Sequence, residues 1–293
     1  MNCYKLDDVE LHGEILEGND LSGVAVVGNN LIVGSDEAAS VQILRADKKG
    51  YKVHHTLVLD PSGLEIDIEA VAAKGSAVYV TGSHSRVREV DKKGNLGAIA
   101  LRPSRDRAFR FQLSDDGQPG PVSAMSLRAA IDGHAVLKDF APLASKENGI
   151  DIEGLAVRKG VLYFGFRGPV LRNNWVPILV CTFDQPDAAT VIYAALDGRG
   201  IRDLVAVDDG FLILAGPMGD GDSSYRLYSW DGNDGLAATN PGRTAMLAKI
   251  PEMPPGKPEG LAVLAEMGKE YELLLLCDGL AAGGATRWKL AKP

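Results

Sequence analysis

The chain has 293 residues, with 31 Lys and Arg against 39 Asp and Glu, which gives a net charge of −8. An acidic chain repels phosphate backbones and no dense basic run offsets this repulsion, so nucleic-acid binding is disfavoured. The longest apolar run, around 273–277, is far too short to span a bilayer.

The cysteines and the first residues bear on the compartment. Cys181 and Cys277 stand inside apolar runs, where a thiol usually acts as a small hydrophobe, and Cys3 lies far from both. Three such cysteines indicate neither a disulfide framework nor a zinc site. The start, MNCYKLDDVELHG, lacks the basic and apolar parts of a secretory signal. We therefore expect a cytoplasmic protein, or a periplasmic or secreted one if a signal segment has been removed.

One short motif recurs five times along the chain. In chain order the copies read DLSGVAV at 20–26, DIEAVAA at 67–73, DIEGLAV at 151–157, IRDLVAV at 201–207 and KPEGLAV at 257–263. Each copy predicts a β-strand, and a turn and a second apolar strand follow it, at 31–33, 78–80, 161–164, 211–214 and 273–276. A β unit that repeats every few dozen residues is typical of a propeller or a solenoid.

Further strands follow within these units. Third strands are predicted at 41–45, 108–113, 178–183, 225–230 and 286–290, and fourth strands at 51–59, 190–196 and 244–250. The last unit has only three strands, whereas the strand-like segment 3–11 belongs to no unit. We expect this N-terminal strand to complete the last sheet and close the ring, because closure leaves no sheet edge bare.

The second unit is longer than the others. The motifs start 47, 84, 50 and 56 residues apart, and three of these intervals fit one four-stranded blade. In the long interval, Leu127, Ile131 and Ala135 recur every four residues and predict a short amphipathic helix within an insertion at about 115–148. We expect a single all-β domain over 1–293, a β-propeller of five blades with this helical insertion in the second. Six blades is the alternative, if 86–150 form a blade of their own.

Polar residues mark the ends of the first two strands in each unit. The start of the first strand in a hairpin lies beside the end of the second. If the first strand is the innermost one, these residues therefore gather at one mouth of the central channel. The opening residues are Asp20, Ser22, Asp67, Glu69, Asp151, Glu153, Asp203 and Glu259, and the closing residues are Asp36, Glu37, His84, Arg167, Asp220 and Asp278.

The carboxylates at this mouth predict a cation site. Crowded carboxylates must take up protons, pair with Arg or Lys, or bind a cation. Ligation by oxygen alone favours calcium or magnesium over zinc, and calcium accepts the looser geometry. The expected metal ligands are Asp67, Glu69, Asp151, Glu153, Asp203 and Glu259. The alternative is a site without metal, in which the acids pair with bases of neighbouring blades, namely Arg86, Arg167, Arg172, Arg202 and Lys257.

Three side chains are candidates for catalysis. His84 closes a second strand between two serines, where it could act as a general base or stand in a solvated loop. Arg167 and Arg172 belong to the stretch YFGFRGPVLRNNW at 163–175, and their guanidinium groups could hold an anionic group. The alternative for Arg167 is to neutralise Asp151 or Glu153.

The chain resembles an uncharacterised bacterial family, the domain of unknown function numbered thirty-six sixteen. The resemblance rests on DIEGLAV followed by LYFGFRGPVLRNNW, and on DIEAVA and RAFRFQLSDDG, and it covers nearly the whole chain. It implies a β-propeller similar to phytase-like and esterase-like propellers, with no established activity. Phytase-like propellers bind calcium through acids at the channel mouth, and the resemblance places these acids at Glu69, Glu153 and Glu259.

Two functions follow as expectations. The first is a divalent-metal-dependent hydrolase of a small anionic ester, lactone or phosphate, with His84 or a free carboxylate moving protons. The second is a non-catalytic scaffold that binds a ligand or a protein partner across one face, with the acids acting as ties between blades. Neither involves nucleic acid or a membrane.

Overall fold

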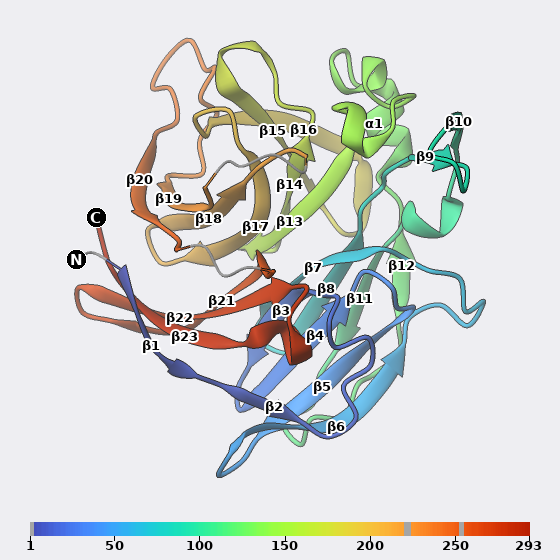
Figure 1. Cartoon of the computed structure of the whole chain (residues 1–293). Helices are drawn as coiled ribbons and strands as arrows, with labels where there is room; N and C mark the ends of the chain where they lie inside the picture. Colours follow the sequence, from blue (N-terminus) through green and yellow to red (C-terminus); the bar gives the residue numbers. More distant parts are fainter. Residues whose placement is uncertain (1–2, 220–223, 252–254) are drawn as a thin grey trace.

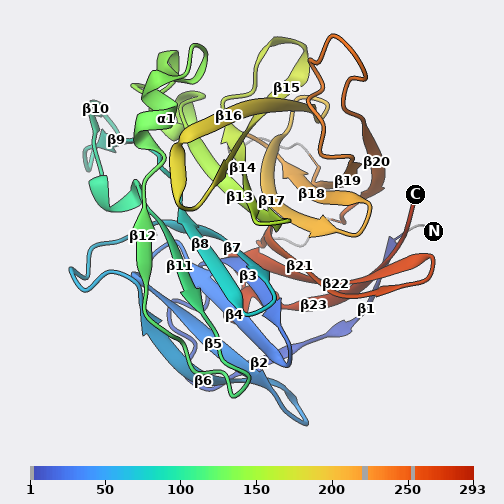
Figure 2. The same ribbon diagram turned by 180° about the vertical axis from the view of Figure 1, so that it is seen from behind.

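The protein is an all-β, five-bladed propeller. The computed structural model describes residues 3–219, 224–251 and 255–293, so Asp220 lies outside the described residues. Figures 1 and 2 show the ring of sheets from its two sides. Within the described residues, no helix has the length and apolar character needed to cross a bilayer.

Each blade consists of four main strands. Blade 1 contains β3 (Leu21–Val27), β4 (Asn30–Ser35), β5 (Ser40–Ala46) and β6 (Gly50–Val58), and blade 2 contains β7 (Ile68–Lys74), β8 (Ala77–Gly82), β11 (Ala108–Gln112) and β12 (Ser123–Met125). Blade 3 contains β13 (Asp151–Arg158), β14 (Val161–Gly168), β15 (Trp175–Thr182) and β16 (Gln185–Ala195). Blade 4 contains β17 (Gly200–Val207), β18 (Gly210–Gly216), β19 (Arg226–Trp230) and β20 (Thr244–Lys249). Blade 5 contains β21 (Lys257–Met267), β22 (Glu270–Asp278), β23 (Thr286–Ala291) and β1 (Cys3–Asp8).

The N-terminal segment takes part in two blades. β1 pairs antiparallel with β23, with Cys3 opposite Leu290 and Asp8 opposite Thr286, and forms the outer strand of blade 5. The chain then continues into β2 (Glu10–His12), which pairs in parallel with β6 at the outer edge of blade 1. The segment expected as one strand over 3–11 is thus two short strands that join the last blade to the first (Figure 1).

The first strand of every repeat is the innermost strand of its blade, so the condition for the acids to gather at one mouth is met. β3, β7, β13, β17 and β21 contact one another in turn around the channel. Small residues in the motif allow this approach. A Cβ added at Gly23 would lie 2.9 Å from the backbone nitrogen of Val71, and one added at Gly154 would lie 2.6 Å from Cγ2 of Ile201. Glycine is therefore required where neighbouring inner strands converge.

The core fills the spaces between successive blades. Ile32, Ile43, Val80, Phe109 and Phe111 form part of one buried cluster between blades 1 and 2. A larger cluster joins blades 2, 3 and 4. Burying each such side chain contributes about 1.5–3 kcal/mol to folding, so the contacts between blades hold the ring together.

Two insertions explain the long second interval. β9 (Val87–Val90) and β10 (Leu96–Ala100) form a separate hairpin between β8 and the 3-10 turn η1 (Pro103–Arg105), which precedes β11. Between blades 2 and 3 lie α1 (Arg128–Gly133) and the 3-10 turns η2 (Leu137–Asp139) and η3 (Ser145–Glu147). The hairpin and α1 lie side by side beyond the ring in both views (Figures 1 and 2). Residues 86–150 thus supply two strands of blade 2 and these insertions, and no sixth blade occurs in the described chain.

Candidate functional site

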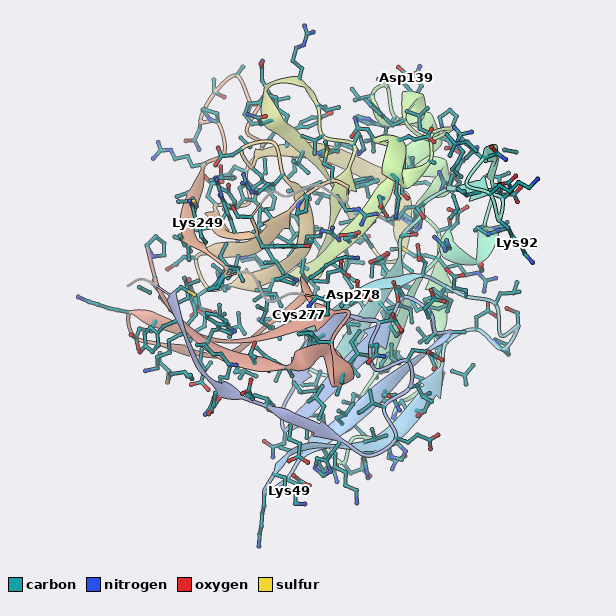
Figure 3. All side chains as sticks on the ribbon, viewed as in Figure 1. Lys49, Lys92, Asp139, Lys249, Cys277 and Asp278 are labelled. Carbon is teal, nitrogen blue, oxygen red and sulfur yellow. The ribbon has the colours of Figure 1, made fainter. Side chains whose placement is uncertain are left out.

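A cavity of about 530 Å³ opens at the mouth of the channel where the inner strands begin. Charged side chains from all five blades line it, as the repeat register predicts. Asp278, at the end of β22, lies near the middle of the molecule in Figure 3. The acids of this lining are Asp36, Asp67, Glu69, Glu147, Asp151, Glu153, Glu259 and Asp278, and the bases are Arg88, Arg105, Lys146, Arg167, Arg202 and Lys257. Eight acids against six bases leave a formal charge of −2 when all are ionised.

Arg167 pairs with the two acids of its own blade. Its guanidinium contacts the carboxylate of Asp151, and its Nη1 lies 2.6 Å from Oε1 of Glu153. Both acids start β13, two residues apart on one face, and Arg167 ends the adjacent strand β14. The alternative in which Arg167 neutralises Asp151 or Glu153 is thus present in the structure. All three side chains line the cavity.

Arg202 ties three blades together. From β17 of blade 4, its Nη1 lies 3.0 Å from Oε2 of Glu153 in blade 3 and 2.7 Å from Oε1 of Glu259 in blade 5. Its side chain is only 4% exposed. Burial raises the pKa of Glu153 to about 8, and the guanidinium groups of Arg167 and Arg202 oppose this rise. Glu153 and Glu259 are therefore bound to a buried cation of the chain itself.

Glu69 differs from the other acids of the cluster. Its carboxylate lies with those of Asp151 and Glu153 so that one oxygen of each is within 4.8 Å of the others. No ion pair joins Glu69 to any described residue. Burial, followed by the charges of neighbouring acids such as Glu153, raises its pKa well above the ordinary value. A carboxyl group in this position must hold a proton or a bound cation.

Asp36, which follows β4, is a second acid of this kind. Burial raises its pKa to about 8, and the charges of Asp67, Glu259 and Asp278 add to this effect. Its buried Oδ1 has no hydrogen-bond partner among the described residues. This carboxyl group is thus protonated near neutral pH. Sequence analysis placed Asp36 at the mouth but not among the site residues.

Asp67 is held by a base that the repeat pattern does not contain. Nη1 of Arg105 lies 2.7 Å from Oδ2 of Asp67, and the Ser85 hydroxyl donates to the same oxygen at 3.4 Å. Burial raises the pKa of Asp67 to about 6, and Arg105 opposes the rise. Arg105 comes from η1, outside every repeat, so no sequence signal pointed to it.

Asp203 does not line the cavity, although its register predicts that it does. Its carboxylate accepts hydrogen bonds from the backbone nitrogens of Leu204 and Leu261, each at 2.7 Å. The bond from Leu261 joins blade 4 to blade 5. The Asp203 carboxylate is therefore occupied by backbone donors and does not belong to the group of Glu69, Asp151 and Glu153.

The catalytic candidates His84 and Arg172 also lie away from the cavity lining. His84 is completely buried: Nδ1 is 3.0 Å from the Gly82 carbonyl oxygen, and Nε2 accepts from the Leu127 backbone nitrogen at 3.2 Å. Burial lowers the pKa of His84 to about 4, so a neutral ring attaches the helical insertion to blade 2. The alternative of a solvated loop histidine is wrong, because the side chain is buried. Arg172 is exposed in η4 (Arg172–Asn174).

Comparisons with known proteins place this geometry in context. A glutaminyl cyclase from Myxococcus xanthus is similar in structure, with a TM-score of 0.51 and 10% identity over 99% of this chain and 97% of that chain. An exo-beta-1,3-galactanase from Clostridium thermocellum has a TM-score of 0.51 and 11% identity over 98% of this chain and 62% of that chain. At 10–11% identity, these similarities show a shared fold and do not indicate a shared function. A search of curated proteins gave no match.

The family comparison agrees with the resemblance seen in the sequence. The family model matches residues 20–102 and 121–288, which span all five blades. The gap between the two matched parts falls on β11 and its flanking loops. The chain belongs to the family described as protein of unknown function (DUF3616).

Proposed function

We propose that the protein is a divalent-metal-dependent hydrolase of a small anionic ester, lactone or phosphate. One observation carries the proposal: three carboxylate oxygens, from Glu69, Asp151 and Glu153, approach one another within 4.8 Å in a cavity with an excess of acids. A divalent cation between them would offset this negative charge. The propeller fold is compatible with an enzyme and with a scaffold, so the argument depends on the site.

The donor set fits a hard cation. All three ligand groups are carboxylates, which suit calcium or magnesium, and calcium tolerates irregular geometry better. Glu69 has no competing ion pair with a described residue, whereas both oxygens of Glu153 already contact arginines. Glu69 would therefore be the principal ligand, supported by Asp151. Glu153 would act mainly by holding Arg167 beside them.

The residues around the three acids suit the binding of an anion and the movement of a proton. When bound, a cation supplies polarisation of the scissile bond and an activated water. The guanidinium of Arg167, which contacts both Asp151 and Glu153, faces the same cavity and can orient an anionic group. Asp36, protonated near neutral pH, can donate a proton to a leaving group. This role was expected of His84 or a free carboxylate, and the burial of His84 favours the carboxylate.

Calorimetric titration tests the cation site. Protein stripped with a chelator is titrated with calcium and then with magnesium. We expect saturable heat in the wild type and at least a tenfold loss of affinity in Glu69→Gln, because Glu69 is the member of the three-acid group that makes no ion pair with a described residue. Glu272→Gln is the matched control, since Glu272 pairs with Arg287 outside the cavity. Absence of heat at millimolar metal would exclude the proposal.

A second candidate function has its own support. Arg202 joins Glu153 and Glu259 across three blades, as expected for a scaffold in which the acids hold the ring together. Such a scaffold would bind a ligand or a protein partner without catalysis. The two candidates give Glu69 different roles. The metal-dependent enzyme needs its carboxylate as a ligand, whereas the scaffold does not, because Glu69 makes no ion pair with a described residue.

A further inference from the structure

The cavity has an apolar side. The two insertions form this wall, where Val87, Val90 and Leu96 of the hairpin and Ala144 before η3 line the space. Val90 is 58% exposed and Leu96 is 72% exposed, although both side chains are apolar. Apolar side chains left open to solvent at the rim of a charged pocket indicate a place for an apolar part of a ligand.

The register of the hairpin places Val90 and Leu96 on one face, and both line the cavity. Leu96 lies opposite Val90 in the antiparallel pair of β9 and β10, and directly opposed side chains point to one face. Arg88, two residues before Val90, shares that face and also lines the cavity. By contrast, Lys92 in the hairpin turn lies at the outer edge of the molecule (Figure 3). The hairpin thus presents one cationic side chain, Arg88, and three apolar ones, Val87, Val90 and Leu96, to the cavity.

Contacts between the two insertions fix this wall in place. Nε and Nη2 of Arg88 lie 2.6 and 2.7 Å from the two carboxylate oxygens of Glu147, and Nη1 donates to the Gly97 carbonyl oxygen at 2.8 Å. The backbone nitrogen of Ser145 donates to the carbonyl oxygen of Arg86 at 3.0 Å. A preformed wall can accept a ligand without a large ordering cost.

We propose that this wall selects an amphipathic substrate, in which an anionic group joins an alkyl or acyl group that packs on Val90 and Leu96. The anionic group would lie at the charged floor beside Arg167. This inference rests on the proposed function, because it assigns the apolar part of the same substrate. A volume of about 530 Å³ suits a small molecule rather than a protein segment. A wholly polar substrate would leave the apolar wall in contact with water.

Binding of n-alkylphosphonates, from methyl to hexyl, tests the inference without any need for turnover. Each is titrated calorimetrically into the full chain, once with calcium and once with chelator. We expect the affinity to rise about fourfold for each added methylene, because each CH₂ leaves water for the wall. Equal affinity for all chain lengths, or no binding by any phosphonate under either condition, would overturn the inference.

Matched variants locate the effect. The double variant Val90→Ser, Leu96→Ser should bind methylphosphonate with the affinity of the wild type. Its affinity should no longer rise with the length of the alkyl chain. Leu101→Ser is the control, since Leu101 is 58% exposed but does not line the cavity. An unchanged gain in the double variant would contradict the assignment. If the gain is present but neither cation heat nor ester hydrolysis is found, the proposed function fails and the assignment of the wall stands.

Discussion

The carboxylates of the cavity differ in how their charge is balanced. Glu153 and Glu259 contact the buried guanidinium of Arg202, whereas Glu69 and Asp36 have no cationic partner in the described chain. A buried charge is costly unless it is paired. The first two acids therefore stabilise the fold, and the other two destabilise it unless they are protonated or bind a cation.

Substitutions at Glu69 and Glu259 should act in opposite directions. In chelator, Glu259→Gln should lower the free energy of unfolding by about 3 kcal/mol, because it removes a partner of buried Arg202. Glu69→Gln should leave this free energy unchanged or raise it by about 0.5–2 kcal/mol, because no described partner is lost. Chemical denaturation measures both. A large loss in Glu69→Gln would favour the scaffold over the enzyme.

The raised pKa of Asp36 makes the stability of the metal-free protein depend on pH. The pKa is about 8 in the folded protein and near 3.8 when the chain is unfolded, so the folded state holds more protons between these values. The free energy of unfolding should therefore fall as pH rises from about 4 to about 8. Denaturation at pH 5, 6.5 and 8 in chelator measures this fall, and Asp36→Asn should reduce it. Stability that increases with pH across this range would contradict the assignment.

The sequence predicted which acids meet and included Arg167 and Arg202 among their possible partners, but it did not predict which base each acid contacts. Glu69, Glu153 and Glu259 recur at one register of a repeated strand, and Asp151 lies two residues before Glu153 on the same strand, so the fold alone brings them to one mouth. Their partners depend on long side chains that cross between blades, as Arg202 does, or that come from outside the repeat. No pattern of spacing encodes such contacts.

At the scale of elements, the repeated strands were predictable and the insertions were only partly so. The inner strands share a motif, whereas the hairpin of β9 and β10 is short, exposed and outside every repeat. Its position depends on the pair between Arg88 and Glu147, which are 59 residues apart. The expected helix is also shorter than its apolar spacing predicts, because α1 ends at Gly133 and glycine is a poor helix former.

At the scale of the whole molecule, stability should depend on β1. Deleting residues 1–15 removes the outer strand of blade 5 and also β2 from blade 1. We expect the melting temperature to fall by about 10 °C or more, because an unpaired edge and part of the core become exposed. Thermal unfolding followed by circular dichroism measures this change. An unchanged melt would show that the ring does not depend on this segment.

A point variant serves as the control for this deletion. Asp7→Ala removes the exposed ion pair with Arg287 but keeps β1 in place. An exposed ion pair contributes little to stability, so the melting temperature should fall by no more than about 2–4 °C. A fall as large as that of the deletion would assign the effect to the ion pair instead of the strand.

The pairing of β1 with β23 also bears on how the protein is made. Cys3 and Leu290 are partners in one sheet, so a nascent chain carries β1 unpaired until β23 has left the ribosome. Contacts so distant along the chain form slowly, because a long loop must first be closed. A chain interrupted before β23 would keep bare edges at which other chains can add, and chaperones would have to shield such fragments from aggregation.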